Sequence, residues 1–108
     1  MTGIAHIIAL GGGGFSDGTD PGLDAYILEQ ARAPRPRVGF VGTASGDADS
    51  YFAKFYPAFT KLDCRPTHIP FFRRTPDLAS VLAGLDVVYV GGGNTRSMLA
   101  VWREWGFE

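Results

Sequence analysis

Two glycine-rich loops in this sequence have the composition of sites that stabilise negative charge. The segments GGGGFSDG (11–18) and GGGNTRS (91–97) each follow a short apolar run. Consecutive glycines permit unusual backbone dihedrals and let another group approach the main chain closely. Backbone N–H groups in such loops, near a helix N-terminus, favour an anion. The two candidate anions are a bound phosphate and the oxyanion that forms during acyl transfer.

The phosphate interpretation lacks the spacing that nucleotide-binding motifs require. In the first loop, a G-x-G-x-x-G fingerprint that starts at Gly11 would need glycine where Ser16 stands, and one that starts at Gly12 would need it at Asp17. Neither loop continues into the Gly-Lys-Ser/Thr of a phosphate-binding P-loop. Nucleotide binding is therefore the weaker of the two interpretations.

Composition and charge exclude several classes of partner. The 108 residues are enough for one small domain, and the formal net charge of -1 is spread over interspersed charges, which argues against nucleic acid as a partner. No apolar run approaches the length of about 18 residues that a membrane helix needs, so we expect a cytoplasmic protein without a membrane partner. The single cysteine, Cys64, allows no intramolecular disulfide, and we expect a small buried or half-exposed side chain there, with a reactive thiol as the alternative.

The elements that must position these loops form one repeated pattern. Four short runs rich in apolar residues predict strands at residues 4–10, 37–41, 67–72 and 87–90. Apolar stripes at helical spacing predict helices after Asp20-Pro21, over 52–59, from Thr75-Pro76-Asp77 to Gly84, and from Met98 to Gly106. Pro57 is expected to bend or divide the second of these helices.

Strands that alternate with single helices predict βαβ units. The fold class is therefore α/β, with a doubly wound, mostly parallel sheet and helices on both faces. Ligands bind such sheets at the carboxyl ends of the strands, where this chain carries residues 11–18, 42–50, 72–75 and 91–97. His6 and His68 fall inside predicted strands, where a core or sheet-edge role is expected.

Three separated motifs resemble a known family. ALGGGGFSD (9–17), VGFVGTASGD (38–47) and YVGGGNTRSMLAVWREWG (89–106) are similar, in this order, to the N-terminal half of the peptidase E-like serine peptidases of family S51. This family includes aspartyl dipeptidases and is related to cyanophycinases. The resemblance covers essentially the whole chain and makes residues 1–108 the N-terminal part of a single peptidase domain.

The resemblance implies a fold similar to class I glutamine amidotransferases, with a serine nucleophile in a G-x-S-A-G context and no metal or organic cofactor. It implies that Gly92 and Gly93 are oxyanion-hole donors, with Asn94 as a neighbouring polar contact. A side chain at the glycines would obstruct a substrate that must come close to the backbone. The alternative is that Gly91 to Gly93 only make a tight strand-to-helix turn, with Asn94 or Thr95 capping the next helix.

The chain departs from the family in one respect that decides activity. The family's G-x-S-A-G does not occur in it, so no catalytic residue is assigned here and the chain alone is predicted to be inactive. Ser45, in TASGD, is the serine closest to a substrate-contacting context, with a loop or capping role as the alternative. A sheet that lacks a central strand would expose an apolar edge, so we expect the remainder of the peptidase domain, or another chain, to cover it.

Substrate preference follows only from the resemblance, which implies small peptides with N-terminal Asp. Arg73, Arg74 and Arg96 are candidates for holding the substrate carboxylate, with solvated surface arginines as the alternative. The rival to a peptidase half is a non-catalytic α/β binding module, which uses the glycine loops to bind a small anionic ligand or a protein partner. A peptidase requires G-x-S-x-G in a longer reading frame, and a binding module does not.

Overall fold

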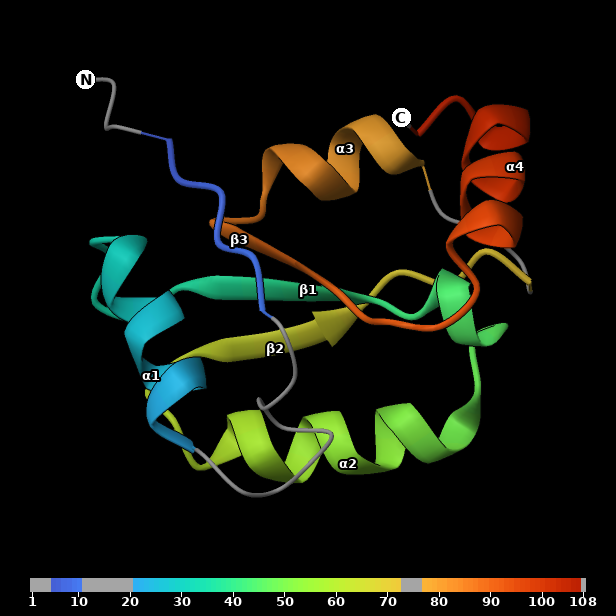
Figure 1. Cartoon of the computed structure of the whole chain (residues 1–108). Helices are drawn as coiled ribbons and strands as arrows, with labels where there is room; N and C mark the ends of the chain where they lie inside the picture. The colour runs from blue at the N-terminus through green and yellow to red at the C-terminus, as the bar shows by residue number, and fades with distance from the viewer. Residues whose placement is uncertain (1–4, 11–20, 73–76, 108) are drawn as a thin grey trace.

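Three short parallel strands form the centre of the molecule in the computed structural model, which describes residues 5–10, 21–72 and 77–107. The strands are β1 (Arg37–Val41), β2 (Arg65–His68) and β3 (Val87–Val90), in the order β2-β1-β3 (Figure 1). In this register Arg37 lies opposite Arg65, and Val38 lies opposite Val87. β1 occupies the centre, and every residue from Val38 to Val41 is buried.

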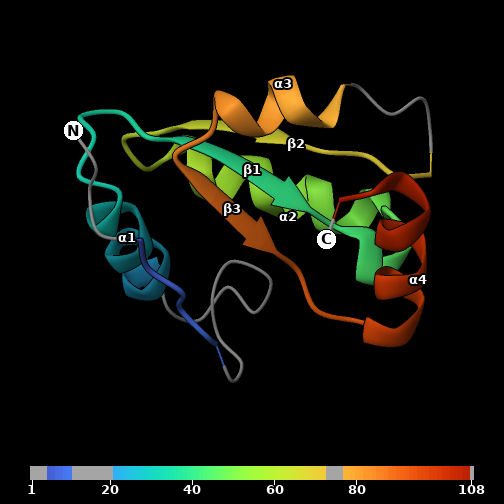
Figure 2. The ribbon, with the colours of Figure 1, turned by 90° about the horizontal axis from the view of Figure 1, so that it is seen from above.

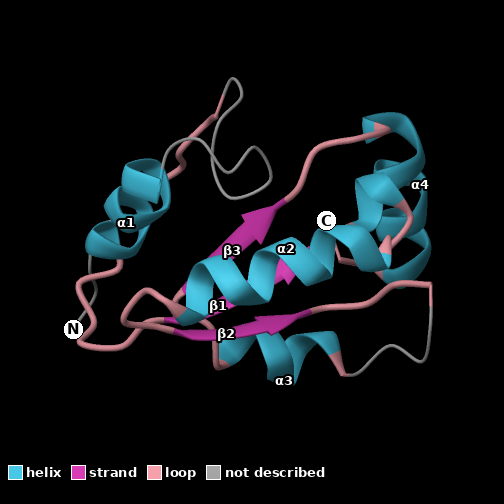
Figure 3. Cartoon of the chain, turned by 90° about the horizontal axis from the view of Figure 1, so that it is seen from below, coloured by secondary structure: helices cyan, strands magenta, loops and turns pink. Residues whose placement is uncertain are grey.

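Helices cover both faces of this sheet. They are α1 (Pro21–Gln30), α2 (Asp49–Thr60), α3 (Leu78–Ala83) and α4 (Thr95–Trp105), with a short 3-10 helix, η1 (Thr43–Ser45), after β1. α2 lies across the strands on one side, and α3 lies on the other (Figures 1 and 3). α4 stands beyond the carboxyl ends of the strands, next to η1. The predicted α/β class, with parallel strands and helices on both faces, is confirmed.

The alternation of side chains along β1 builds a separate core on each face. Phe40 points to the α1 and α2 side, where its ring stacks on Phe55 with centroids 5.0 Å apart. Val41 points to the other side and packs in a cluster with Ile69 and Phe71 that residues of α3 and α4 surround. Because successive residues of a strand face opposite ways, one buried strand supplies both cores.

Two predicted strands have the expected bounds and a third is displaced. Residues 37–41 and 87–90 form β1 and β3 as predicted. The strand predicted over 67–72 instead occupies Arg65–His68. It ends early because the backbone amides of Phe71 and Phe72 donate to the Asp47 carboxylate and not to a neighbouring strand.

The prediction of a strand over 4–10 is wrong for residues 5–10, which the structure describes. Residues 5–10 have no regular secondary structure, His6 is exposed and not in a core or sheet edge, and Ile7 is fully exposed. This segment runs beside β3 in the same general direction without pairing to it (Figure 2). The described sheet consists of β2, β1 and β3, and residues 5–10 share none of the backbone pairing that makes a strand.

The helices follow the sequence prediction with one correction. α2 is not divided at Pro57, because Phe55 and Phe59, on either side of the proline, are both fully buried and hold the two halves to the same core. α4 ends at Gly106 as predicted, with the glycine in the left-handed conformation that closes a helix. Asp20, Thr75 and Pro76, predicted to begin helices, lie outside the described residues.

Candidate functional site

The loops at the carboxyl ends of β1 and β3 meet and hold each other by backbone hydrogen bonds. The amide of Asn94 donates to the carbonyl of Ala44 over 2.7 Å. The indole Nε1 of Trp102, on α4, donates to the hydroxyl of Thr43 over 3.0 Å. Figure 1 shows η1 beside the first turn of α4. The sequence segments TASGD and GGGNT therefore form one surface.

Gly93 is a position in this surface where a side chain would be strained and would clash. Its φ is +141°, a conformation that other residues rarely adopt, and a Cβ there would lie 2.3 Å from the carbonyl oxygen of Ala44. Gly92 differs, because a Cβ on it would meet no atom of the described residues within 4 Å. One glycine is thus required for the contact between the two loops, while its neighbour faces open space.

The amides of these two glycines donate to no acceptor among the described residues. Gly91 donates to the carbonyl of Val41, and Asn94 donates to that of Ala44. Between them, neither Gly92 nor Gly93 makes a hydrogen bond to any residue that the structure describes. Both glycines are exposed. Two adjacent unpaired N–H groups beside a helix N-terminus are the arrangement that stabilises an oxyanion.

Asn94 has the capping role that the sequence left open. Its side-chain oxygen accepts a hydrogen bond from the amide of Ser97 over 2.9 Å, which caps the N-terminus of α4. The side-chain NH2 group of Asn94 is not needed for this bond. Arg96 is exposed in the first turn of the same helix, while Arg73 and Arg74 lie outside the described residues.

Ser45 borders the glycine loop from the β1 side. Its hydroxyl donates to the carbonyl of Gly42 over 3.0 Å, which closes η1, and the side chain is half-buried. The Ser45 amide nitrogen lies 3.1 Å from where a Cβ on Gly93 would be. The loop role is therefore visible, and the backbone of Ser45 is brought next to the predicted oxyanion-hole residues.

Asp47 is a residue that the sequence analysis did not single out. Its side chain is buried, its φ is +54°, and one carboxylate oxygen accepts from the amides of Phe71 at 2.6 Å and Phe72 at 2.9 Å. The other oxygen, Oδ1, has no partner among the described residues. A signal was present in the sequence, since an aspartate directly after glycine in a loop at a strand's carboxyl end is suited to a left-handed conformation.

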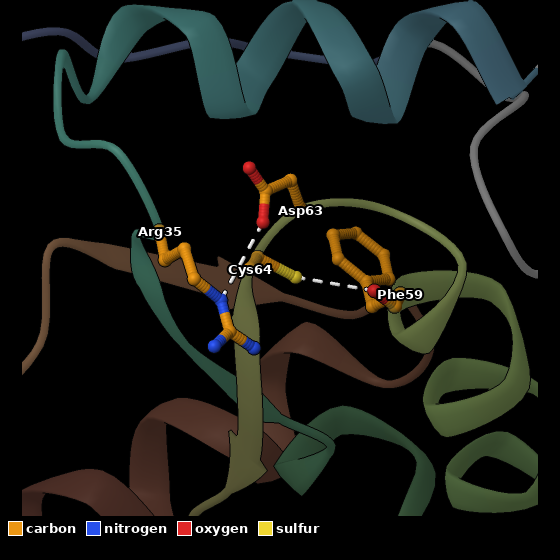
Figure 4. Close-up of polar contacts among 4 residues, drawn as sticks. All are labelled: Arg35, Phe59, Asp63 and Cys64. Carbon is orange, nitrogen blue, oxygen red and sulfur yellow. Dashed lines mark hydrogen bonds and ion pairs between the residues drawn. The ribbon is translucent and has the colours of Figure 1, made fainter.

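Cys64 is a buried structural residue, as predicted. Its thiol donates to the carbonyl of Phe59 over 3.2 Å, and a nearby ion pair joins Arg35 Nε to Asp63 Oδ1 over 3.4 Å (Figure 4). Burial raises the pKa of the Cys64 thiol, the charge of Asp63 raises it further, and Arg35 opposes both. A thiol of raised pKa is a poor nucleophile at neutral pH, so Cys64 is poorly suited to a nucleophilic role.

A second polar group, distant from the glycine loop in sequence, joins α2 to β2. The hydroxyl of Tyr56 lies 2.6 Å from Nδ1 of His68, whose ring packs on Phe52 with centroids 4.4 Å apart. Burial raises the pKa of Tyr56, and a hydrogen bond with Thr67 partly offsets this rise. His68 thus has the sheet-edge role that was expected for it.

The described residues show neither a metal site nor a membrane-spanning helix. They contain no group of three or more His, Cys, Asp or Glu side chains that would hold a metal ion. None of the helices within them combines the length and apolar character needed to span a membrane.

Comparison with known proteins supplies the family. The model of Peptidase family S51 matches residues 7–108. The chain is 51% identical over 107 residues to the uncharacterized peptidase YgaJ of Bacillus subtilis (strain 168), a match that covers 97% of this chain and 46% of YgaJ. The chain thus spans about half the length of this curated relative, and no solved structure gives a significant match to it. This chain therefore belongs to peptidase family S51.

Proposed function

We propose that this chain is the N-terminal half of a serine dipeptidase that hydrolyses small peptides with N-terminal Asp. The family supports peptidase activity in general. The observation that carries the finer proposal is the pair of adjacent glycine amides, Gly92 and Gly93, that donate no hydrogen bond among the described residues while both neighbours do. These amides are held at a loop that Gly93, Ala44 and Asn94 fix.

In this mechanism the glycine amides stabilise the tetrahedral oxyanion. A serine hydroxyl from the rest of the domain attacks the peptide carbonyl, and negative charge develops on the carbonyl oxygen. Donors that are already in place at that oxygen lower the barrier without further reorganisation, and one such donor is worth about 3 kcal/mol. Gly92 is suited to this role because no atom of the described residues lies within 4 Å of its Cβ position to obstruct the approach of a substrate.

Specificity for an acidic substrate requires a cation near the glycine loop. Arg96 meets this requirement best among the described residues, because it is exposed in the first turn of α4, two residues after Asn94. A guanidinium can hold a carboxylate through two parallel hydrogen bonds. Arg73 and Arg74 remain candidates on the sequence alone.

The test is a full-length chimera in which residues 1–108 replace the matched half of YgaJ. The chimera should release aspartate from an Asp-X dipeptide, and a serine-directed reagent should stop turnover. Residues 1–108 alone should show none. Gly92→Pro removes one donor and should lower kcat by about 10² to 10³-fold. Gly92→Ala keeps the N–H group and is the matched control, so it should retain much more of kcat.

Two results would count against the proposal. Equal losses of kcat in the proline and alanine variants would mean that Gly92 matters for space and not as a donor. A folded chimera that hydrolyses no dipeptide but binds a small anion would favour the non-catalytic binding module.

A further inference from the structure

We infer that a groove at the amino ends of β1 and β2 binds a small phosphate monoester, whose phosphate group Arg37 and Arg65 hold together. The groove lies between these two strands and α3, and its volume is about 310 Å³. Small-molecule sites in proteins begin at about this size. Both strands begin at the end of the sheet opposite to η1 and α4 (Figure 1), so the groove is separate from the glycine loop. The inference does not depend on the proposed peptidase activity.

The two arginines lie side by side at the groove. Arg37 and Arg65 are partners in the register of the parallel β1–β2 pair, which places their backbones one strand spacing, roughly 4.8 Å, apart. Side chains alternate along a strand, so both arginines project on the face that carries Val41, where α3 packs. Like charges directly opposite each other on neighbouring strands are destabilising. An anion bound to both guanidinium groups would offset this repulsion.

Neither guanidinium has a partner of opposite charge among the described residues. The ion pair at this end of the sheet joins a different arginine, Arg35, to Asp63 (Figure 4). The Asp86 carboxylate accepts a hydrogen bond over 2.9 Å from the backbone amide of Arg37 and not from its guanidinium. Arg37 and Arg65 are both exposed. Their guanidinium donors can therefore turn to a ligand in the groove.

The wall of the groove opposite the arginines is largely apolar. Val81 of α3 and Leu85, in the turn after that helix, line it together with Pro66 of β2. Leu85 packs directly on β1 because Gly39 has no side chain, and a Cβ there would lie 2.5 Å from Leu85 Cδ1. An apolar group attached to the bound anion would lie against this surface and lose its contact with water.

The end of α3 brings the Arg37 side chain to the groove. Gly84, which follows this helix, lines the groove as well. Nη1 of Arg37 lies 3.6 Å from the position that a Cβ on Gly84 would occupy. The charged end of Arg37 is thus beside the groove wall, within the same small volume as the apolar side chains.

Charge and geometry favour a phosphate monoester over a carboxylate as the ligand. A guanidinium binds carboxylate or phosphate oxygens through two parallel hydrogen bonds. One arginine satisfies the two oxygens and single charge of a carboxylate. A phosphate monoester has three terminal oxygens and a charge of about -1.5 to -2 at neutral pH. Two adjacent arginines therefore match it in charge and in the number of acceptors.

Isothermal titration calorimetry with phenyl phosphate tests the inference, on residues 1–108 and on the full-length chimera. Arg37→Gln and Arg65→Gln should each weaken binding by about 10-fold or more, because each removes a charged hydrogen-bonding partner. Arg35→Gln is the matched control. It removes the same charge from an arginine that pairs with Asp63, and it should weaken binding by less than about 2-fold at physiological salt. Absence of binding to the folded proteins, or equal losses in all three variants, would overturn the inference.

Backbone amide chemical shifts give the location of the ligand. Phenyl phosphate should shift the NMR signals of Gly84 and Leu85 and leave those of Gly92 and Gly93 unchanged. Shifts confined to Gly92 and Gly93 would overturn the inference, because the anion would then bind the glycine loop.

Inorganic phosphate tests the role of the apolar wall. It lacks the phenyl group and should bind about 5- to 10-fold more weakly than phenyl phosphate. Equal affinities for the two would overturn the assignment of an ester with an apolar group. None of these measurements involves turnover, so an inactive chimera would leave their results independent of the proposed function.

Discussion

The side-chain oxygen Oδ2 of Asp47 lies 2.6 Å from the backbone nitrogen of Phe71. Through this bond, and a second one to the amide of Phe72 at 2.9 Å, the loop after β1 holds the chain that leaves β2. The same loop holds the glycine turn after β3 through the bond from Asn94 to the Ala44 carbonyl. One short segment thus joins the carboxyl ends of all three strands.

Removal of the Asp47 carboxylate should destabilise the domain and loosen the exit from β2. Asp47→Ala leaves the buried amide of Phe71 and the part-buried amide of Phe72 without an acceptor. The expected loss in free energy of unfolding is about 2 to 4 kcal/mol, measured by urea denaturation. Asp63→Ala is the control, because its ion pair with Arg35 is exposed and should be worth less than about 1 kcal/mol. Equal losses in the two variants would contradict the assigned role of Asp47.

The two adjacent glycines of the loop should respond differently to an added methyl group. Gly93→Ala puts a Cβ 2.3 Å from the Ala44 carbonyl oxygen at a φ of +141°, so we expect a loss of at least about 2 kcal/mol. The Cβ of Gly92→Ala meets no atom within 4 Å in the part of the chain that the structure describes, so this variant should change stability by less than about 1 kcal/mol. Thermal unfolding of both variants measures the difference. If Gly93→Ala unfolded at the wild-type temperature, the close contact with Ala44 would not exist in solution.

Substitution of Arg96 should raise KM more for acidic substrates than for neutral ones. If Arg96 binds the substrate carboxylate as proposed, Arg96→Ala in the active chimera should raise KM for an Asp-X dipeptide by about 10-fold or more. The neutral Asn-X dipeptide is the control, and its KM should change little. Arg103→Ala, toward the other end of α4, controls for loss of a helix charge. A parallel rise in KM for both dipeptides would remove Arg96 from substrate selection.

Much of the sheet and the glycine loop could be predicted because their signals are local. The apolar runs at 37–41 and 87–90 gave the correct bounds of β1 and β3, and the polar residue after three glycines caps α4. β2 lies earlier in the chain than predicted, and the reason is physical. An edge strand needs no continuous apolar run, so RPTH carried a weaker strand signal than the more apolar residues that follow it.

Two features depended on contacts that no local pattern reports. The prediction of a strand at 4–10 is wrong because a strand also requires backbone pairing, which the described residues of this segment do not make with any strand of the sheet. The sequence does not identify Asp47, because its carboxylate accepts hydrogen bonds from the amides of Phe71 and Phe72, which are more than 20 residues away in the sequence. The oxyanion-hole assignment of Gly92 and Gly93 stays a prediction, since only chemistry on a substrate tests it.

The Cys64 thiol should make stability depend on alkaline pH. Burial and the neighbouring Asp63 raise the pKa of this thiol above its usual value of 9.0, so the folded protein holds the proton more tightly than the unfolded chain does. The resulting stabilisation is fully present below pH 9.0 and is lost as the pH rises from there through the raised pKa. Cys64→Ala lacks the titrating group and is the comparison. The free energy of unfolding, measured in urea from pH 7 to 11, should fall more steeply with pH in the wild type than in this variant. Parallel curves would mean that Cys64 titrates alike in both states, as an exposed thiol would.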